Sequence, residues 1–321
     1  MIIKKIVELA GVTWAQSQSS TNSWYVLCVT PTGRTIAAAN NSYIYYSDDN
    51  GVTWTQSQSL SKSWRALCVT PTGRIIAAAS SDYIYYSDDN GVTWTQSQCS
   101  SRAWYALCVT PTGRVIAAPT NNDYIYYSDD DGVTWTQSQS LRDYWGALCV
   151  TPTGRVIVSN THYIYYSDDN GVTWTQLQSY DKPWQKLCVA STGRIIATTD
   201  DYIYYSDDNG ETWTQSQSPN KYWTALCITS TGRVLACTTS NYIYYSDDNG
   251  KTWTQSRSPS KSWRALCTTL TGRVIAAANN DYIYYSDPEV ETRFPKYLDH
   301  EGAQELVTQF KAYVDSLVGS E

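Results

Sequence analysis

Three residue types that can carry chemistry recur at a fixed interval along this sequence. Seven arginines each follow a Thr-Gly pair: Arg34, Arg74, Arg114, Arg155, Arg194, Arg233 and Arg273. Seven cysteines each follow a Trp-x-x-Leu segment: Cys28, Cys68, Cys108, Cys149, Cys188, Cys227 and Cys267. An Asp-Asp pair opens a turn at the same interval, first at Asp48 and Asp49. Arginines could bind phosphate or carboxylate groups, cysteines could form disulfides, and Asp-rich turns could bind Ca²⁺.

A structural interpretation accounts for each of these sets. Because nearly every turn carries two aspartates, we expect each arginine to pair with the turn of its own or a neighbouring unit. One turn offers few oxygen ligands for Ca²⁺, so no metal site is predicted, and no cofactor either. Equivalent cysteines should be farther apart than the Cα limit of about 7 Å for a disulfide. We therefore expect reduced thiols that pack as small apolar residues.

Groups for acid–base catalysis are scarce. The chain has 2 His, and Glu211 is the only glutamate between residues 11 and 288. No pair of carboxylates is singled out to act as acid and base, as glycoside hydrolysis requires. The sequence therefore predicts a protein that is not an enzyme.

The composition excludes several other classes of protein. A hydrophobic fraction of 42% and a charged fraction of 17% argue against a disordered chain. No apolar run reaches the roughly 20 residues that span a bilayer, so we expect no membrane insertion. The net charge of −7 argues against nucleic-acid binding, which requires a basic surface.

These residues lie in a repeated unit of about 40 residues, marked by seven copies of Tyr-Ile-Tyr-Tyr-Ser-Asp. In the second unit, residues 64–70, 74–79, 83–87 and 92–97 are predicted strands separated by turn residues. Asn90-Gly91 between the last two strands is a hairpin signal. Four short strands in about 40 residues are typical of a β-propeller blade. A solenoid is the competing interpretation, but it would need distinct capping repeats.

The two ends of the repeat region complement each other. Gly11-Val12-Thr13-Trp14 has no Tyr-rich strand before it, and the last Tyr-rich strand, at 282–287, has no Gly-x-Thr-Trp strand after it. The sequence therefore predicts an all-β fold, a seven-bladed β-propeller closed by its N-terminal strand. The predicted domains are a head at 1–10, the propeller at 11–288 and a helical tail at 289–321.

The turn after the Tyr-rich strand carries a family resemblance. The segment 47–54, Ser-Asp-Asp-Asn-Gly-Val-Thr-Trp, resembles the Asp-box, or BNR repeat, of sialidase-type propellers, and five further complete copies follow. The resemblance implies a structural hairpin on the face away from the usual ligand site, with its Trp buried. It assigns structural roles to Ser47, Asp49, Gly51, Trp54, Ser87, Asp89, Gly91 and Trp94. Sialidases also need an arginine triad, a Tyr nucleophile with a Glu partner and an acidic proton donor, and their absence here argues against sialidase activity.

A binding surface is predicted where the repeats differ, in the loops before each Trp-x-x-Leu-Cys strand and before each Tyr-rich strand. A four-stranded blade places both loops on one rim. Aromatic faces flanked by polar groups suit sugars, and the alternative is that the tryptophans are core. The candidate ligand-binding residues are Trp24, Trp64, Trp104, Trp145, Trp184, Trp223 and Trp263, with Arg65, Asp82, Tyr105 and Asp123. Trp64 with Arg65 and Asp82, and Trp104 with Tyr105 and Asp123, are the sample pockets.

The tail is predicted to form an amphipathic helix, with Ala303, Leu306, Val307, Phe310, Val314 and Leu317 on its apolar face. We expect it to support homo-oligomerisation or docking. Residues 296–299 (KYLD) and 311–316 (KAYVDS) resemble segments of phage or prophage tail proteins of Gram-positive bacteria. Glu8 interrupts any signal peptide, which predicts synthesis in the cytoplasm. The resemblance to phage proteins extends this prediction to later incorporation in a virion.

The leading functional prediction is a non-catalytic, multivalent binding module that recognises a glycan or cell-surface polysaccharide, like a lectin. Identical sites around a ring would gain avidity. Two alternatives stay open. One is a protein-interaction or assembly scaffold, as in the Asp-box propellers that assist photosystem assembly. The other is a recently amplified or engineered repeat propeller without an evolved ligand, which nearly identical repeats also fit.

Overall fold

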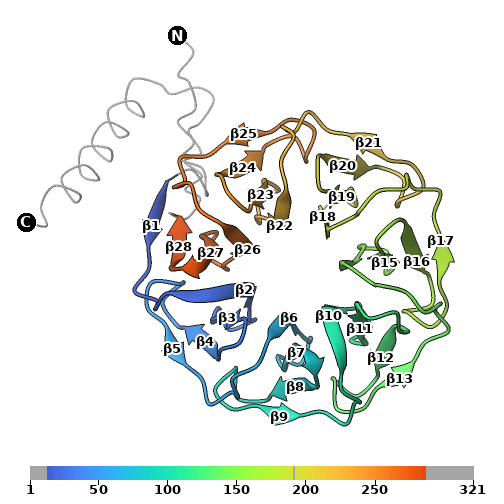
Figure 1. Cartoon of the computed structure of the whole chain (residues 1–321), viewed down its shortest axis with the longest axis horizontal. Helices are drawn as coiled ribbons and strands as arrows, with labels where there is room; N and C mark the ends of the chain where they lie inside the picture. The colour runs from blue at the N-terminus through green and yellow to red at the C-terminus, as the bar shows by residue number, and fades with distance from the viewer. Residues whose placement is uncertain (1–12, 191, 287–321) are drawn as a thin grey trace, which may run out of the picture. The chain divides into compact units, whose positions relative to one another are not determined.

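The computed structural model describes residues 13–190 and 192–286, and every regular element in these ranges is a β-strand. The strands form antiparallel meanders of four, the arrangement of a propeller blade. Figure 1 shows the meanders side by side around a common centre. The prediction of an all-β, propeller-like fold with four-stranded blades is thus confirmed. The predicted head at 1–10 and helix at 289–321 lie outside the described residues.

The strands fall into four sets by their distance from the centre (Figure 1). The innermost strands are β2 (Asn22–Val29), β6 (Trp64–Val69), β10 (Arg102–Val109), β14 (Leu148–Val150), β18 (Lys186–Val189), β22 (Trp223–Ile228) and β26 (Trp263–Thr268). The second strands are β3 (Thr35–Ala39), β7 (Ile75–Asp82), β11 (Val115–Pro119), β15 (Val156–Ser159), β19 (Ile195–Thr198), β23 (Val234–Thr238) and β27 (Val274–Asp281).

The two outer sets are shorter. The third strands are β4 (Ile44–Ser47), β8 (Ile84–Ser87), β12 (Tyr126–Ser128), β16 (Ile164–Ser167), β20 (Ile203–Ser206), β24 (Ile243–Ser246) and β28 (Ile283–Ser286). The outermost strands are β5 (Thr55–Gln56), β9 (Thr95–Gln96), β13 (Thr136–Gln137), β17 (Thr175–Gln176), β21 (Thr214–Gln215), β25 (Thr254–Gln255) and β1 (Trp14–Gln16). The outermost strand of the second unit is shorter than the predicted 92–97, because residues 88–94 form one extended turn in place of a tight hairpin.

The hydrophobic core lies between adjacent meanders. One apolar cluster joins Ile36, Ala38 and Ile44 of β3 and β4 to Trp64 and Leu67 of β6. Equivalent clusters occur between each of the remaining pairs of neighbouring meanders. These include the pair formed by the last strands and the first. The second strands are therefore covered on both faces, and all five residues of β3 are buried. Their alanines leave room for the large side chains of the next meander.

The first described strand completes the meander of the last three. Strand β1 pairs antiparallel with β28, with Trp14 opposite Ser286 and Gln16 opposite Tyr284. The Ser17 amide donates to the Ile283 carbonyl at 2.9 Å, and the Ile283 amide donates to Ser19 Oγ at 2.9 Å. The outer edge of β28 is thus paired by residues from the opposite end of the chain.

The Asp-box turns are held by the side chains that the resemblance assigned. Ser47 Oγ accepts from the Gly51 amide at 2.8 Å and donates to Asp49 at 2.8 Å. Asp49 also accepts from the Thr53 amide at 2.9 Å and the Thr53 hydroxyl at 2.6 Å. The same bonds recur at Ser87, Asp89, Gly91 and Thr93. One serine and one aspartate therefore satisfy the backbone of each turn.

The glycine of each box also fits the preceding meander. Gly91 has a φ of 92°, which other residues rarely adopt, and a Cβ added there would lie 2.8 Å from Ile36 Cδ1. The box of one meander therefore packs directly on the second strand of its neighbour.

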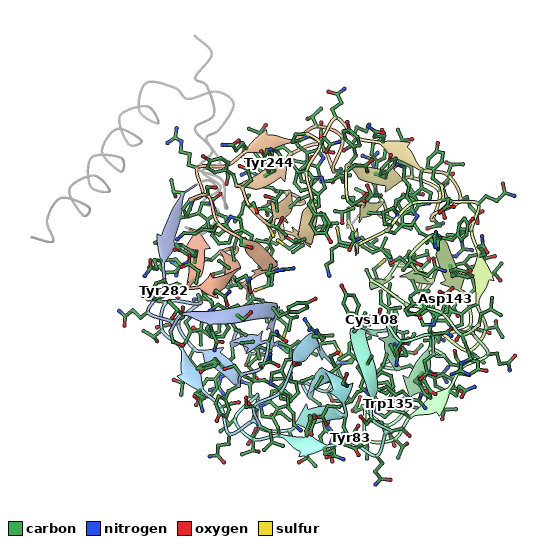
Figure 2. The ribbon with its side chains drawn as sticks, viewed as in Figure 1. Tyr83, Cys108, Trp135, Asp143, Tyr244 and Tyr282 are labelled. Carbon is green, nitrogen blue, oxygen red and sulfur yellow. The ribbon has the colours of Figure 1, made fainter. Side chains whose placement is uncertain are left out.

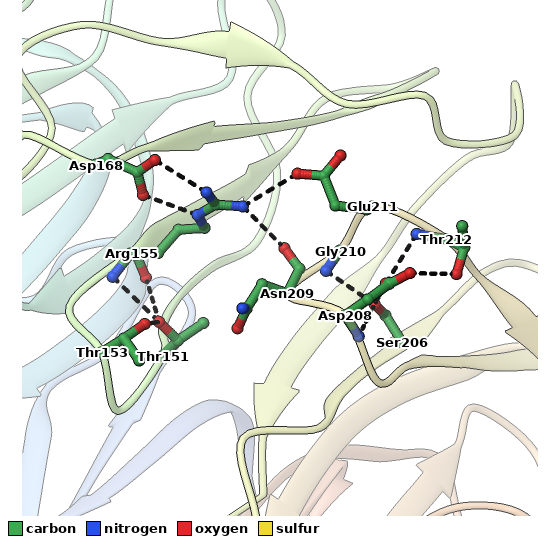
Figure 3. A network of polar contacts seen from close by, with 10 residues as sticks. All are labelled: Thr151, Thr153, Arg155, Asp168, Ser206, Asp208, Asn209, Gly210, Glu211 and Thr212. Atoms are coloured by element: carbon green, nitrogen blue, oxygen red, sulfur yellow. Dashed lines mark hydrogen bonds and ion pairs between the residues drawn. The ribbon is translucent and has the colours of Figure 1, made fainter.

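The repeated arginines link neighbouring boxes, as the charge balance predicted (Figure 3). Arg155 Nε donates to Asp168 of its own meander at 2.8 Å, and its Nη1 donates to the Asn209 carbonyl and to Glu211 of the next at 3.4 and 3.3 Å. The guanidinium also stacks over Tyr166, 4.1 Å from the ring centroid. Glu211, the lone glutamate of the repeat region, is thus an ion-pair partner on the Asp-box face.

Removing β1 should disrupt the fold. We expect a chain lacking residues 1–20 to aggregate or to lose its cooperative thermal transition, because β28 then exposes an unpaired edge. Size-exclusion chromatography and calorimetry measure both effects. A deletion of residues 1–12, which keeps β1, is the control. A monomeric 1–20 deletion with an unchanged melting curve would contradict the pairing.

The Asp-box should make stability depend on acid pH. Burial alone would raise the pKa of Asp49, but hydrogen bonds from Thr53, Ser47 and the Val52 amide outweigh it, so the pKa is lowered. The same bonds lower the pKa of Asp89. Because the folded state prefers the charged form, this stabilisation is complete above the ordinary pKa of about 3.9 and is lost as the pH falls through the lowered value.

We expect Asp49→Asn to lower the free energy of unfolding at pH 7 by about 1 kcal/mol, since the site is solvent-exposed, and to flatten the acid dependence. Asp48→Asn is the matched control, because Asp48 is itself exposed, accepts only from Arg34 and should contribute less. Urea denaturation between pH 2 and 7 gives both values. Equal effects of the two variants would refute the assigned role of Asp49.

Candidate functional site

The seven inner-strand tryptophans are core residues, which corrects their assignment as a ligand-binding surface. Their exposed fractions are 0% for Trp24, Trp64, Trp145, Trp223 and Trp263, 1% for Trp104 and 3% for Trp184. The ring of Trp64 meets Tyr85 edge-on at 5.4 Å and lies 6.2 Å from Trp94. Its Nε1 donates to the Ser42 carbonyl of the preceding meander at 3.1 Å. Each of these indoles wedges two meanders together and offers no face to a ligand.

The Asp-box tryptophans are less buried than the resemblance implied. Trp54 and Trp94 are half-buried, and their Nε1 atoms donate to the box carbonyls of Gly51 and Gly91 at 3.0 and 3.2 Å. They cover the outer edge of the core, while the inner-strand tryptophans fill it.

The two sample pockets are also corrected, because their residues lie in different places. Asp82, at the end of β7, pairs with Lys62, and Asp123 pairs with Arg102, at the start of β10. Arg65 and Tyr105 belong to the innermost strands and face the centre of the ring. The structure therefore separates the carboxylates from Arg65 and Tyr105, which it brings to one common pocket.

A β-bulge aims these central residues. The register of the inner strand shifts between Trp64 and Ala66, so Arg65 is the extra residue of β6. The same shift makes Tyr25 and Tyr105 the extra residues of β2 and β10. Strands β22 and β26 shift in the same way. Bulges often redirect a side chain next to a functional site. Here the buried Trp anchors the strand, and the residue after it turns to the centre.

These residues line a central pocket of about 320 Å³, within the range of small-ligand sites. All seven innermost segments contribute, and the repeated leucines form its apolar part. The larger polar and aromatic lining residues are Tyr25, Arg65, Tyr105, Gln185, Lys186, Tyr222, Thr224 and Arg264. Because they stand at the starts of the inner strands, the pocket lies on the variable-loop side, opposite the Asp-boxes. In Figure 2, labelled Cys108 of β10 lies near this centre and Trp135 lies farther out.

Cations and tyrosines are paired within the pocket. The guanidinium of Arg65 stacks over Tyr25 at 4.3 Å, and Lys186 Nζ lies 5.2 Å from the Tyr105 ring centroid. Burial lowers the pKa of Lys186, and nearby Arg264 lowers it further, although Tyr25 opposes the shift. Burial, reinforced by Tyr105, raises the pKa of Tyr25. The pocket is therefore a positively charged and partly desolvated environment.

The described lining of the pocket includes no aspartate, glutamate or histidine. The cysteine ring follows the repeated leucines along the same strands, and its described thiols are free. Burial raises the pKa of Cys28, Cys108 and Cys188 to about 12, so these thiols stay protonated at neutral pH. The arrangement can bind a ligand through cations, hydroxyls and aromatic rings, but its lining supplies no ordinary acid–base pair.

Residues 13–190 and 192–286 contain no cluster of three or more His, Cys, Asp or Glu that could hold a metal ion. In the same ranges, no helix has the length and apolarity to cross a membrane.

The sequence-based prediction missed Gln185, Lys186, Thr224 and Arg264. A signal for most of them was present, in the position that directly follows each inner-strand Trp. That position reads Tyr, Arg, Tyr, Gly, Gln, Thr and Arg through the seven repeats, although the flanking Trp and Leu never change. Lys186 stands where five repeats have alanine. The binding surface was predicted in the variable loops, but the variation among repeats is most concentrated next to the inner-strand Trp.

Two family models match parts of this chain. Residues 45–56, 85–96 and 126–137 match the BNR/Asp-box repeat, and residues 159–257 match the DUF6242 beta propeller domain. The chain thus carries BNR/Asp-box repeats. A search of curated proteins finds no significant match.

Solved propellers resemble this structure in fold. Virginiamycin B lyase from Staphylococcus aureus matches with a TM-score of 0.72 and 13% identity, covering 86% of this chain and 98% of that one. YCF48 from Cyanidioschyzon merolae matches with a TM-score of 0.69 and 14% identity, with the same coverage. The computationally designed Ika8 protein matches with a TM-score of 0.62 and 10% identity, covering 84% and 98%. Identities this low show a common fold and nothing of function.

The two tryptophan sets should differ in their contribution to stability. We expect Trp64→Ala to lower the free energy of unfolding by about 3–5 kcal/mol, because it empties a fully buried wedge. Trp54→Ala should cost less, because that ring is half-buried. Urea denaturation of both variants measures the difference. A small effect of Trp64→Ala, or the reverse order, would contradict the core assignment.

Proposed function

We propose that this chain is a closed seven-bladed propeller that acts as a non-catalytic binding module, with a glycan as its ligand and the central pocket as its site. The pairing of β1 with β28 and the apolar clusters between all neighbouring meanders support closure. This proposal replaces seven equivalent sites on the rim with one site per ring.

The observation that carries the proposal is the break in repetition at the pocket. Strand cores and Asp-boxes are nearly identical, but the position after the inner-strand Trp changes from repeat to repeat, and six of its seven residues line the pocket. Loops vary because they are exposed. A half-buried position next to the repeated Trp is constrained by packing, so exposure does not explain its variation. A set of different side chains around one cavity is typical of a specific site for one asymmetric ligand.

The chemistry of the lining favours a glycan. Tyr222 is 48% exposed and presents an aromatic surface in the same pocket as the amide of Gln185. Aromatic rings pack against the CH faces of sugars, while amides, hydroxyls and cations bind their hydroxyl groups. Pockets that combine apolar walls with a few directed polar groups fix both the orientation and the identity of a ligand.

The lining also supports a binding role over catalysis. A virginiamycin B lyase with a histidine replaced by alanine is described as catalytically inactive. The pocket of this chain has no histidine among its described residues, and no carboxylate that could serve as acid or base. The competing scaffold role draws on YCF48, which has been solved bound to D1 peptide. That likeness is one of fold, so peptide binding is treated as an outcome of the test.

A glycan array followed by calorimetry tests the proposal. We expect a positive glycan to bind with a stoichiometry of one per chain. Tyr105→Gly, which installs the residue of the fourth repeat, should weaken binding about tenfold or more by removing an aromatic wall. Tyr144→Ser, which installs the residue of three other repeats at an exposed rim position, is the matched control and should bind normally.

Three results would overturn this proposal. They are the absence of binding to any glycan on the array, a stoichiometry near seven ligands per chain, and a loss of binding in Tyr144→Ser without a loss in Tyr105→Gly.

A further inference from the structure

The central pocket gathers three cations that have no carboxylate partner. Among the described residues, Arg65, Lys186 and Arg264 form no ion pair, and their head groups donate no hydrogen bond to a carboxylate. The cations of the surrounding loops differ, since Lys62 and Lys261 each pair with an aspartate of their own blade. Three cations without a carboxylate partner thus share one pocket in a chain whose net charge is −7.

Two of these cations, Arg65 and Lys186, are held in position by aromatic rings. Stacking over Tyr25 covers one face of the Arg65 guanidinium, while the N–H groups at its edge stay available to a ligand. Lys186 enters from the opposite side of the ring, on β18, and lies over Tyr105 of β10. Gathering like charges in a partly buried pocket is unfavourable unless a counter-charge enters. Because the cations are already gathered before a ligand arrives, the pocket favours an anion over a neutral molecule.

We infer that the ligand of the central pocket is an acidic glycan, whose anionic group is bound by Arg65, Lys186 and Arg264. This inference rests on the proposed function and adds the charge of the ligand to it. A carboxylate and a sulfate share the required chemistry, since both accept several charge-assisted hydrogen bonds at once. The neighbouring Gln185 then contacts a hydroxyl group of the sugar that carries the anion.

The repeats themselves supply substitutions that this fold already accommodates. Lys186→Ala installs the residue found at Ala66, Ala106, Ala147, Ala225 and Ala265. Arg264→Gln installs the residue found at the equivalent Gln185. The control is Arg257→Gln, which removes one positive charge from an exposed position where other repeats have glutamine, as at Gln58 and Gln98. All three variants change the net charge equally, so a general electrostatic effect would appear in each.

Calorimetric titration with three probes tests the inference. The probes are trigalacturonate, its uncharged methyl ester, and a sulfated heparin tetrasaccharide. We expect at least one acidic probe to bind the full-length chain about tenfold or more tightly than the ester. Lys186→Ala and Arg264→Gln should each lose about tenfold in affinity for that probe, while Arg257→Gln stays within about twofold. The better of the two acidic probes identifies the anionic group.

The outcomes separate this inference from the proposed function. Equal binding of the acidic probe and the ester, or equal losses in all three variants, overturns the anionic site and leaves glycan binding intact. Absence of binding by both acidic probes also overturns it, and the glycan array then decides the proposed function independently. A separate titration with an Asp-rich peptide checks the class of ligand: its binding in place of every saccharide retains a cationic site but overturns the glycan as its ligand.

Discussion

The packing of a large indole against small residues of the next blade is the interaction on which this fold depends. Trp64 of β6 occupies a space bounded by Ile36, Ala38 and Ile44, and every neighbouring pair of meanders repeats this contact. A four-stranded meander of such short strands has little core of its own, so burial between blades supplies the hydrophobic stabilisation. The tryptophans of the inner strands therefore pack between blades in space that the small alanines of the second strands leave open.

The same wedge also determines where ligands can and cannot bind. Because the seven inner-strand indoles are buried in the core, these regularly recurring tryptophans are absent from the surface. In β2, β6, β10, β22 and β26 the residue after the anchored Trp forms a bulge that faces the centre. Structural repetition and functional variation thus occupy adjacent positions of the chain, with the repeated Trp supporting the variable residue after it.

Charge is distributed differently on the two sides of the ring. On the Asp-box side, Arg155 and its equivalents bond to the turns of two adjacent blades and so link the blades in order. These pairs involve exposed carboxylates, and their contribution is geometric more than energetic. In the central pocket Arg65 and Lys186 lie over tyrosine rings and pair with no described carboxylate, which leaves their charge available to an incoming group.

The sequence by itself determined the repeat, the four strands of each unit, the complementary ends and the residues of the Asp-box. These follow from local patterns, since strand periodicity, turn residues and side-chain-to-turn hydrogen bonds act within a few positions of one another. It also predicted that Arg34 and its equivalents pair with Asp-rich turns, because the charges balance within one unit. Only the tertiary structure decided which aromatic residues are core, because Trp64 is covered by residues of another blade. It alone brought Tyr25, Arg65, Tyr105, Lys186 and Arg264 together, because the ring gathers positions from repeats about 40 residues long. A bulge that no local pattern announces turns Tyr25, Arg65, Tyr105 and Arg264 to its centre.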